Sequence, residues 1–277
     1  MTEETIAFLG GGNMTTSLIN GLIDDGYDPA RLWVSEPDLS RQQNLRSRFG
    51  VYVTGQNSEA ASQGQTVVFA VKPQVMNSVV LEVASLLAHR QPQPLVVSIA
   101  AGVREPDIRR WLGYDGAVVR AMPNTPALVR CGAAALYANP FVDEMQRNSA
   151  ESLLRSVGIT LWVDDEDLLD VVTALSGSGP AYLFLWMEMM ANAGKRLGLT
   201  QETARLLTLQ TAFGAAKMAL ESSEDPATLR ARVTSTGGTT ERALQVFQRG
   251  GIERLFYEAL DSARARAAEL GKLFGGT

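Results

Sequence analysis

The sequence predicts an α/β protein, with a doubly wound parallel sheet in its N-terminal part and an all-α region after it. Short apolar runs alternate with helical patterns over residues 5–125, and strands that are apolar on both faces are typical of a parallel sheet covered by helices on each side. A glycine-rich turn follows the first of these runs. Beyond about residue 165 the strand patterns cease. We therefore predict two domains, residues 1–162 and residues 163–277.

Five apolar runs predict the strands of the sheet, at residues 5–9, 31–35, 66–71, 95–99 and 117–121. A helix should follow the first run, because Met14, Leu18 and Leu22 recur on one helical face. In a doubly wound sheet the ligand crevice lies at the carboxyl ends of the strands. The residues that end each run are therefore the first candidates for a binding site.

The C-terminal region predicts five helices, at residues 181–191, 200–220, 226 onward, 239–247 and 252–270. Thr200 and Asp225 stand where N-cap residues belong, and Pro226 suits a first helical position. The helix over residues 181–191 is apolar nearly all round, so we expect it to be buried in a bundle or in a subunit interface.

Composition excludes several classes of function. In 277 residues, 25 Lys and Arg stand against 30 Asp and Glu, and the net charge of −5 gives no electrostatic footprint for nucleic acid or an anionic membrane. The single cysteine, Cys131, and the single histidine, His89, exclude a disulfide framework and Cys- or His-rich metal centres, so we expect no metal. The acidic start Met1–Glu4, and the lack of an apolar run of about 18 residues, predict a soluble, cytoplasmic protein.

A run of glycines opens the first helix directly after the first predicted strand. One glycine permits a tight turn and the next lets the backbone approach a pyrophosphate, to which the helix N-terminus offers free N–H groups. The residues predicted to bind the pyrophosphate of a dinucleotide are Gly10, Gly11, Gly12, Asn13 and Met14. Thr15 stands where such turns usually have a third glycine or an alanine, and a tight turn without a ligand is the alternative.

An acidic residue, Glu36, ends the second predicted strand, 24 residues beyond Gly12 (36 − 12). A carboxylate there accepts hydrogen bonds from a ribose 2′-hydroxyl and repels a 2′-phosphate, which leans mildly toward NADH. Ser35 and Arg41 could hold a phosphate, so NADPH stays open. The alternative is a solvated carboxylate at a strand end with no ligand.

The residues that end the next two strands are further candidates for coenzyme contacts, and the small ones among them would leave space for a nicotinamide. They are Ala70, Val71, Lys72 and Pro73 after the third run, and Ala100 and Ala101 after the fourth. Their position at the carboxyl edge predicts that they line the coenzyme crevice. Each could equally be only a turn residue.

A second anion site is predicted in the helical region, where Gly237 and Gly238 precede a helix that begins with Thr239 and Thr240. Because the first turn already accommodates the pyrophosphate, these amides suit a substrate carboxylate. Ser178 stands before the apolar helix, either as a substrate contact or as an architectural cap. With His89 expected on the surface, a hydroxyl such as that of Thr240 suffices for an iminium that already carries its proton, which favours imine reduction.

Six blocks, in this order, resemble those of pyrroline-5-carboxylate reductases along essentially the full chain. They are residues 8–14, 70–73, 98–103, 122–126, 175–182 and 233–240. The resemblance implies reduction of 1-pyrroline-5-carboxylate to L-proline, the last step of proline biosynthesis, with NADPH or, often, NADH. It also implies a Rossmann-type domain followed by a helical dimerisation domain, assembled as a homodimer or a homodecamer through its C-terminal helices.

The same resemblance implies roles for single residues. Thr240 would hydrogen-bond the ring nitrogen of the substrate, and the amides of Gly238 and Thr239 would hold its carboxylate. Coenzyme contacts would come from Asn57, Val71, Lys72 and Ala101, and an acidic residue near the substrate from Glu166. Thr236 departs from the family, which usually has proline there.

Two other functions remain open at this stage. One is a β-hydroxyacid-dehydrogenase relative with the same two-domain plan that reduces a different imine or ketone. The other is a non-catalytic dinucleotide-binding or redox-sensing dimer, against which the second anion site argues.

Overall fold

The computed structural model describes residues 4–276, so Met1–Glu3, most of the acidic start considered above, lie outside the described residues. The chain forms two compact units. The first unit comprises residues 1–178 and 262–277, and the second comprises residues 179–261.

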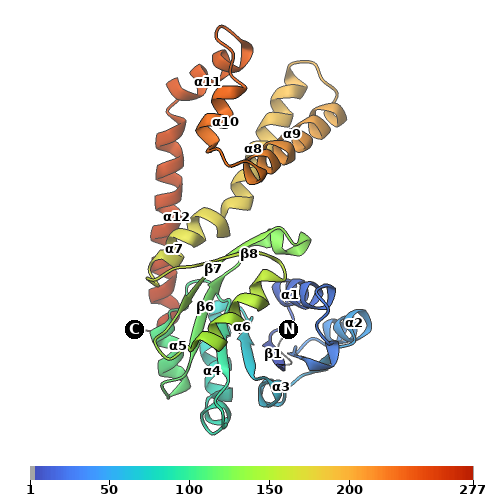
Figure 1. Ribbon diagram of the computed structural model, residues 1–277, viewed down its shortest axis with the longest axis vertical. Coiled ribbons are helices and arrows are strands. Elements are labelled where there is room, and N and C mark those ends of the chain that lie inside the picture. Colours follow the sequence, from blue (N-terminus) through green and yellow to red (C-terminus); the bar gives the residue numbers. More distant parts are fainter. Residues whose placement is uncertain (1–3, 277) are drawn as a thin grey trace. The chain divides into compact units, whose positions relative to one another are not determined.

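The first unit contains one eight-stranded sheet with the order β3-β2-β1-β4-β5-β6-β7-β8. Strands β1, β6, β7 and β8 are labelled in Figure 1. Its strands are β1 (Ile6–Leu9), β2 (Leu32–Ser35), β3 (Tyr52–Thr54), β4 (Thr66–Phe69), β5 (Leu95–Ser98), β6 (Val118–Met122), β7 (Gly132–Ala138) and β8 (Gly158–Trp162). All neighbouring strands are parallel except β6 and β7, which are antiparallel. The five strands that the apolar runs predict are β1, β2, β4, β5 and β6, and β3, β7 and β8 were missed.

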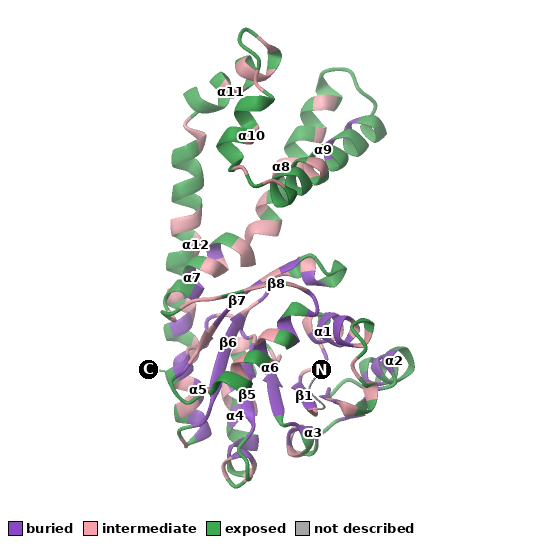
Figure 2. Cartoon of the chain, in the orientation of Figure 1, coloured by how far each residue is buried: buried purple, intermediate pink, exposed green. Residues whose placement is uncertain are grey.

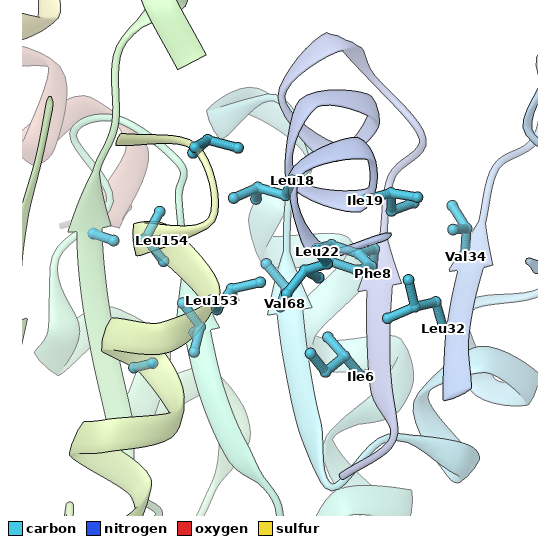
Figure 3. Close-up of a cluster of buried hydrophobic side chains, with 14 of the residues drawn as sticks. Ile6, Phe8, Leu18, Ile19, Leu22, Leu32, Val34, Val68, Leu153 and Leu154 are labelled. Carbon is cyan, nitrogen blue, oxygen red and sulfur yellow. The ribbon is translucent and has the colours of Figure 1, made fainter. Parts of the chain in front are cut away.

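Helices cover both faces of this sheet, as a doubly wound fold requires. They are α1 (Asn13–Asp24), α2 (Leu39–Phe49), α3 (Asn57–Gln63), α4 (Pro73–Ala88), α5 (Glu105–Leu112), α6 (Glu144–Arg155) and α7 (Leu168–Val172), with short helical turns η1 (Pro29–Arg31), η2 (Thr125–Val129) and η3 (Thr173–Gly177). One buried cluster joins α1, α2 and α6 to the strands, with Phe8 and Val68 among its members (Figure 3). The other joins α3, α4 and α5 to the opposite face, which carries Leu9 and Phe69.

The compact units differ from the predicted division after residue 162. Helix α7 belongs to the first unit because its Asp170 pairs with Arg104, at 2.6 Å. The end of α12 (Ile252–Gly275) belongs there because its backbone lies against the loop after β5, where a Cβ added at Gly271 would stand 3.0 Å from the Gly102 carbonyl oxygen.

The second unit is helical, as predicted. It contains α8 (Gly179–Arg196), α9 (Gln201–Glu221), α10 (Pro226–Arg232), α11 (Thr239–Arg249) and the first part of α12. Two predicted N-caps are confirmed, because the Thr200 hydroxyl accepts from the Thr203 amide at 3.2 Å and the Asp225 carboxylate accepts from the Thr228 amide at 2.8 Å.

The apolar helix α8 is not buried by this chain alone. None of its described residues is buried, and Phe184 is 65% exposed. Figure 2 shows α8, α9, α10 and α11 as mostly exposed, and large apolar side chains such as Leu183, Phe213 and Leu220 are among the exposed ones. The expected burial in a bundle is therefore absent within the described chain.

By length and composition alone, the helical stretch Leu168–Arg196 could cross a membrane. The stretch contains no uninterrupted apolar run of about 18 residues, because Glu188 and several small polar residues interrupt it. A single stretch of this kind is weak support for a membrane span, since core helices of soluble proteins satisfy the same criterion.

Candidate active site

The turn after β1 requires glycine at its first position. Gly10 has φ +106°, and its amide donates to the Ser35 carbonyl oxygen at 2.9 Å. A Cβ at Gly10 would lie 2.8 Å from the carbonyl oxygen of Ala70, so the backbone passes directly over the end of β4. A side chain at this position would both strain the backbone and push the two strand ends apart.

The N-terminus of α1 is open. Gly12 is its N-cap, and no side chain of the described residues caps it. A Cβ at Gly12 would meet nothing within 4 Å, and the first helical bond runs from the Thr16 amide to the Gly12 carbonyl. The amides of Asn13 and Met14 precede that bond, as a pyrophosphate site requires.

The departure at Thr15 is accommodated inside the turn. Its side chain is fully buried, and its hydroxyl donates to the Gly10 carbonyl oxygen at 2.6 Å. The threonine therefore ties the first turn of α1 back to the loop, and its side chain is buried away from the open space beside Gly12.

Glu36 is not a solvated carboxylate at a strand end. It is only 5% exposed, and its two oxygens accept from the amides of Gly11 and Asp38, each at 3.0 Å. A Cβ at Gly11 would lie 3.0 Å from one of these oxygens, so the glycine lets the loop approach the carboxylate. Each carboxylate oxygen has a second lone pair, so a ribose hydroxyl can still donate to Glu36.

Ser35 and Asn57 are joined at the same strand end. The Ser35 hydroxyl donates to Asn57 Oδ1 at 2.6 Å, and Asn57 Nδ2 donates to Glu82 at 2.7 Å. Asn57 is the first residue of α3, so the loop after β3 brings its amide group to the end of β2. The structure thus brings Ser35, Glu36 and Asn57 together.

The predicted coenzyme residues after β4 and β5 lie along the same edge, because β1, β4 and β5 are parallel neighbours. Val71 is beside the glycine turn, with a methyl group 3.1 Å from a Cβ built at Gly10. Lys72 is exposed and forms the N-cap of α4, in which Pro73 is the first residue. Ala100 is buried and Ala101 half-buried. The predicted coenzyme residues therefore occupy one edge of the sheet in the first unit.

A buried ionic cluster, which sequence reasoning missed, holds Glu166. Its carboxylate accepts from the Arg120 guanidinium at 2.5 Å and from the Glu105 amide at 2.6 Å. Arg104 extends the cluster to Asp167 and Asp170. Burial lowers the pKa of the Arg120 guanidinium and raises the pKa of the Asp170 carboxyl. The available signal was a lone arginine inside the apolar run that became β6.

Ser178 ends a π-helical turn. Its amide donates to the Thr173 carbonyl at 2.8 Å, five residues back, which closes η3 just before α8 begins. Such turns are rare and are found frequently at functional sites. Ser178 therefore lies at the end of the first unit, at a point where the helical backbone changes its hydrogen-bond register.

The second predicted anion site is a turn that runs into α11. The Gly238 amide donates to the Ser235 carbonyl at 2.9 Å, and Gly237 has φ +73°. Thr236 occupies the second position of this four-residue turn, which proline favours, so the turn forms without the proline of the family. The Gly237 amide donates to the Glu241 carboxylate at 2.7 Å, so this loop already binds one carboxylate.

The first amides of α11 have no helical partner. Gly238 is the N-cap, and the first helical bond joins the Arg242 amide to its carbonyl at 3.3 Å. The amides of Thr239 and Thr240 precede that bond, and the Thr240 side chain is half-buried. Thr240 therefore lies in the first turn of α11, among residues whose amides have no helical partner, within the second unit.

Two expectations concern groups away from these sites. His89 is exposed at the C-terminus of α4, where its ring nitrogen Nδ1 lies 2.7 Å from the Ser85 carbonyl oxygen, as its surface prediction requires. Over residues 4–276, no group of three or more His, Cys, Asp or Glu side chains is placed to hold a metal ion.

Comparisons with known proteins follow the same two parts of the chain. The family model for pyrroline-5-carboxylate reductase dimerisation matches residues 166–270, and the model for coenzyme F420-dependent NADP oxidoreductase matches residues 5–102. A pyrroline-5-carboxylate reductase of Pseudomonas aeruginosa is 49% identical over 275 residues, covering 99% of this chain and 100% of that protein.

Solved structures agree over the full length. A pyrroline-5-carboxylate reductase from Coxiella burnetii has a TM-score of 0.93 at 47% identity, covering 97% of this chain and 99% of that chain. The Plasmodium falciparum pyrroline carboxylate reductase, determined with NADP bound, has a TM-score of 0.85 at 26% identity, covering 98% of this chain and 99% of that chain. Both parts of the fold are therefore shared with these proteins.

Proposed function

The chain belongs to the pyrroline-5-carboxylate reductase family, and from this premise we propose how its own residues carry out the reaction. It transfers a hydride from NAD(P)H to the imine carbon of 1-pyrroline-5-carboxylate and forms L-proline, the last step of proline biosynthesis. One observation carries this function: the two glycine turns predicted to bind anions lead into α1 and α11, and the first amides of these two helices lack helical partners.

The coenzyme is proposed to lie along the carboxyl edge of the sheet. The open N-terminus of α1 fits a pyrophosphate, because a Cβ at Gly12 would meet nothing within 4 Å. Residues from Gly10 to Met14 hold the pyrophosphate. Ser35, Glu36, Asn57 and Lys72 surround the adenosine ribose, and Ala70, Val71, Pro73, Ala100 and Ala101 line the nicotinamide end. The bound coenzyme supplies the hydride, and these residues orient it.

The substrate is proposed to bind by its carboxylate at the start of α11. The Gly238 amide already donates within its turn, so the amide of Thr239 has the larger part in holding the carboxylate. The Thr240 hydroxyl accepts from the N–H of the iminium. When hydride adds to the ring carbon, the electron pair of the C=N bond passes to a nitrogen that already carries its proton, so no strong acid is required.

Two further residues complete the proposed substrate end. Ser178 contributes its hydroxyl from the end of η3. Glu166 acts on the substrate end by holding Arg120, because its carboxylate is already engaged by that guanidinium and by the Glu105 amide.

Steady-state turnover of 1-pyrroline-5-carboxylate with NADH and with NADPH tests this function. Oxidation of either coenzyme that depends on the imino acid is expected. Turnover only with another imine or a ketone would favour the broader β-hydroxyacid-dehydrogenase alternative. Coenzyme binding without turnover on any of these substrates would favour a redox-sensing dimer.

We propose that the chain uses both coenzymes and prefers NADH, because the Glu36 carboxylate repels a 2′-phosphate. Glu36→Ser is expected to raise the ratio of kcat/KM for NADPH to that for NADH about tenfold, which is about 1.4 kcal/mol. Glu36→Gln keeps the size of the side chain and removes its charge, so it should shift the ratio in the same direction. An unchanged ratio in both variants would restrict Glu36 to holding the Gly11 amide.

The second copy of the chain is the proposed partner for the exposed apolar helices. Residues 166–270 match the dimerisation family, and the exposed apolar side chains of α8 lie within that range. An interface there would cover the stretch Leu168–Arg196, in keeping with a soluble, cytoplasmic enzyme that has neither membrane nor nucleic-acid partners. Pairs formed in this way can remain homodimers or assemble into homodecamers.

Phe184→Glu is expected to convert the assembly to monomers at micromolar concentration, because it places a charge within the proposed apolar interface. The matched control is Leu81→Glu on α4, which is also exposed, at 55%, and lies outside residues 166–270. Analytical ultracentrifugation measures both variants. The interface would be elsewhere if Phe184→Glu kept the parent's assembly, or if Leu81→Glu dissociated it equally.

A further inference from the structure

Asn124 bridges three segments of the first unit with one side chain. It lies two residues beyond the end of β6, at the start of η2. Its Oδ1 accepts from the Ala133 amide in β7 at 2.9 Å, and its Nδ2 donates to the Ser176 carbonyl in η3 at 3.0 Å. A carboxamide is suited to this place because it offers an acceptor and a donor together.

The π-helical turn η3 needs such a partner. The hydrogen bond from the Ser178 amide to the Thr173 carbonyl spans five residues, so the carbonyls of the turn leave the α-helical register. The Asn124 side-chain amide donates a hydrogen bond to one of these carbonyls, that of Ser176. On the adjoining side the turn packs closely on β6, where a Cβ at Gly177 would lie 2.6 Å from the terminal methyl of Met122.

The Asn124 bridge lies close to residues that the proposed mechanism uses. Strand β6 is parallel to β5, so its carboxyl end lies at the edge that carries Ala100 and Ala101. Ser178, a proposed substrate contact, is the residue that closes η3. Displacing η3 would therefore move Ser178 with respect to the edge that holds the nicotinamide.

We infer that Asn124 is a positioning residue for the reductase reaction: its carboxamide fixes η3, and with it Ser178, against the coenzyme edge of the sheet. This inference rests on the proposed function. Asn124 acts through the backbone of Ser176, so it affects the placement of the imino acid more than the binding of the coenzyme.

Asn124→Asp tests the inference with almost no change in shape. The carboxylate can still accept from the Ala133 amide, but it cannot donate to the Ser176 carbonyl and instead repels it. At pH 8 the KM for 1-pyrroline-5-carboxylate is expected to rise about tenfold. The KM for the coenzyme and the assembly state should stay within about twofold of the parent.

The pH profile distinguishes this role from general destabilisation. Protonation of the introduced Asp restores a donor toward the Ser176 carbonyl, so the deficit in kcat/KM relative to the parent should shrink as the pH falls. Asn148→Asp, on the exposed surface of α6, adds the same charge in the same unit and should show no deficit. If Asn124→Asp does not fold, Asn124→Ala removes both bonds without adding a charge and carries the same expectation for KM.

Parent turnover, measured in the same assay, separates the two possible failures. If the parent does not reduce 1-pyrroline-5-carboxylate, the proposed function fails and the inference fails with it. If the parent turns over and Asn124→Asp keeps its substrate KM at every pH, only the inference is overturned. Equal losses in the two KM values and in thermal stability, with no recovery at low pH, would also overturn it.

Discussion

Replacing Arg120 by methionine is expected to lower the free energy of unfolding by about 3–5 kcal/mol. The arginine is only 5% exposed in side-chain area, on the interior strand β6, and its guanidinium donates to the Glu166 carboxylate at 2.5 Å. Methionine fills much of the same volume but leaves that carboxylate with one fewer donor in a buried place. The loss of stability arises from the unpaired buried charge of Glu166, because an intact buried ion pair stabilises a protein little more than apolar residues of equal size would.

Chemical denaturation of the parent and the variant, at equal protein concentration, measures this loss. The double variant Arg120→Met with Glu166→Gln should recover a large part of it, since no unpaired charge then remains. The control is Arg155→Met, which breaks an exposed pair with Glu151 and should cost less than about 1 kcal/mol. Equal losses for Arg120→Met and Arg155→Met would mean that burial does not govern the strength of the Arg120 pair.

Apolar strands could be predicted from the sequence, whereas the alanine-rich strand β7 and the Arg120–Glu166 pair could not. Strands β1 and β4 could be predicted because β1 is apolar throughout and β4 is apolar after Thr66, but β7 contains four alanines, which have little preference for strands, and it was missed. Arg120 interrupts an apolar run, and its partner Glu166 lies 46 residues further on. Nothing local in the sequence pairs them, because the chain brings them together only through the tertiary fold.

The two glycine turns were easier to predict, because both depend on local backbone geometry. Gly10 and Gly237 have the positive φ angles that favour glycine, and both turns lead into helices as expected. Side-chain roles were harder. Glu36 was expected to accept from a ribose or to be solvated; the solvated alternative is wrong, because the carboxylate is buried and accepts from two backbone amides, and the ribose contact stays a prediction. Thr15, noted as a departure, proved to be a buried hydrogen-bond donor to the turn.

Removing the hydroxyl of Thr240 is expected to lower kcat ten- to a hundredfold. The Thr240 side chain is half-buried in the first turn of α11, next to amides that have no helical partner. In the proposed mechanism its oxygen accepts from the iminium N–H and keeps the ring oriented for hydride addition. A hydrogen bond to a charged group contributes about 1.5–3 kcal/mol, and about 1.4 kcal/mol corresponds to a tenfold change in rate.

Thr240→Ala and Thr240→Ser together make the test specific. Serine keeps the oxygen and loses only a methyl group, so it should retain most of the parent's kcat, whereas alanine should not. Because the coenzyme is held by the first unit in the proposed mechanism, the KM for NAD(P)H should be unchanged in both variants. Thr240→Ala with the parent's kcat would remove the hydroxyl from the mechanism, and an equal loss in Thr240→Ser would assign the effect to packing of the methyl group, because only the alanine variant lacks an acceptor for the iminium proton.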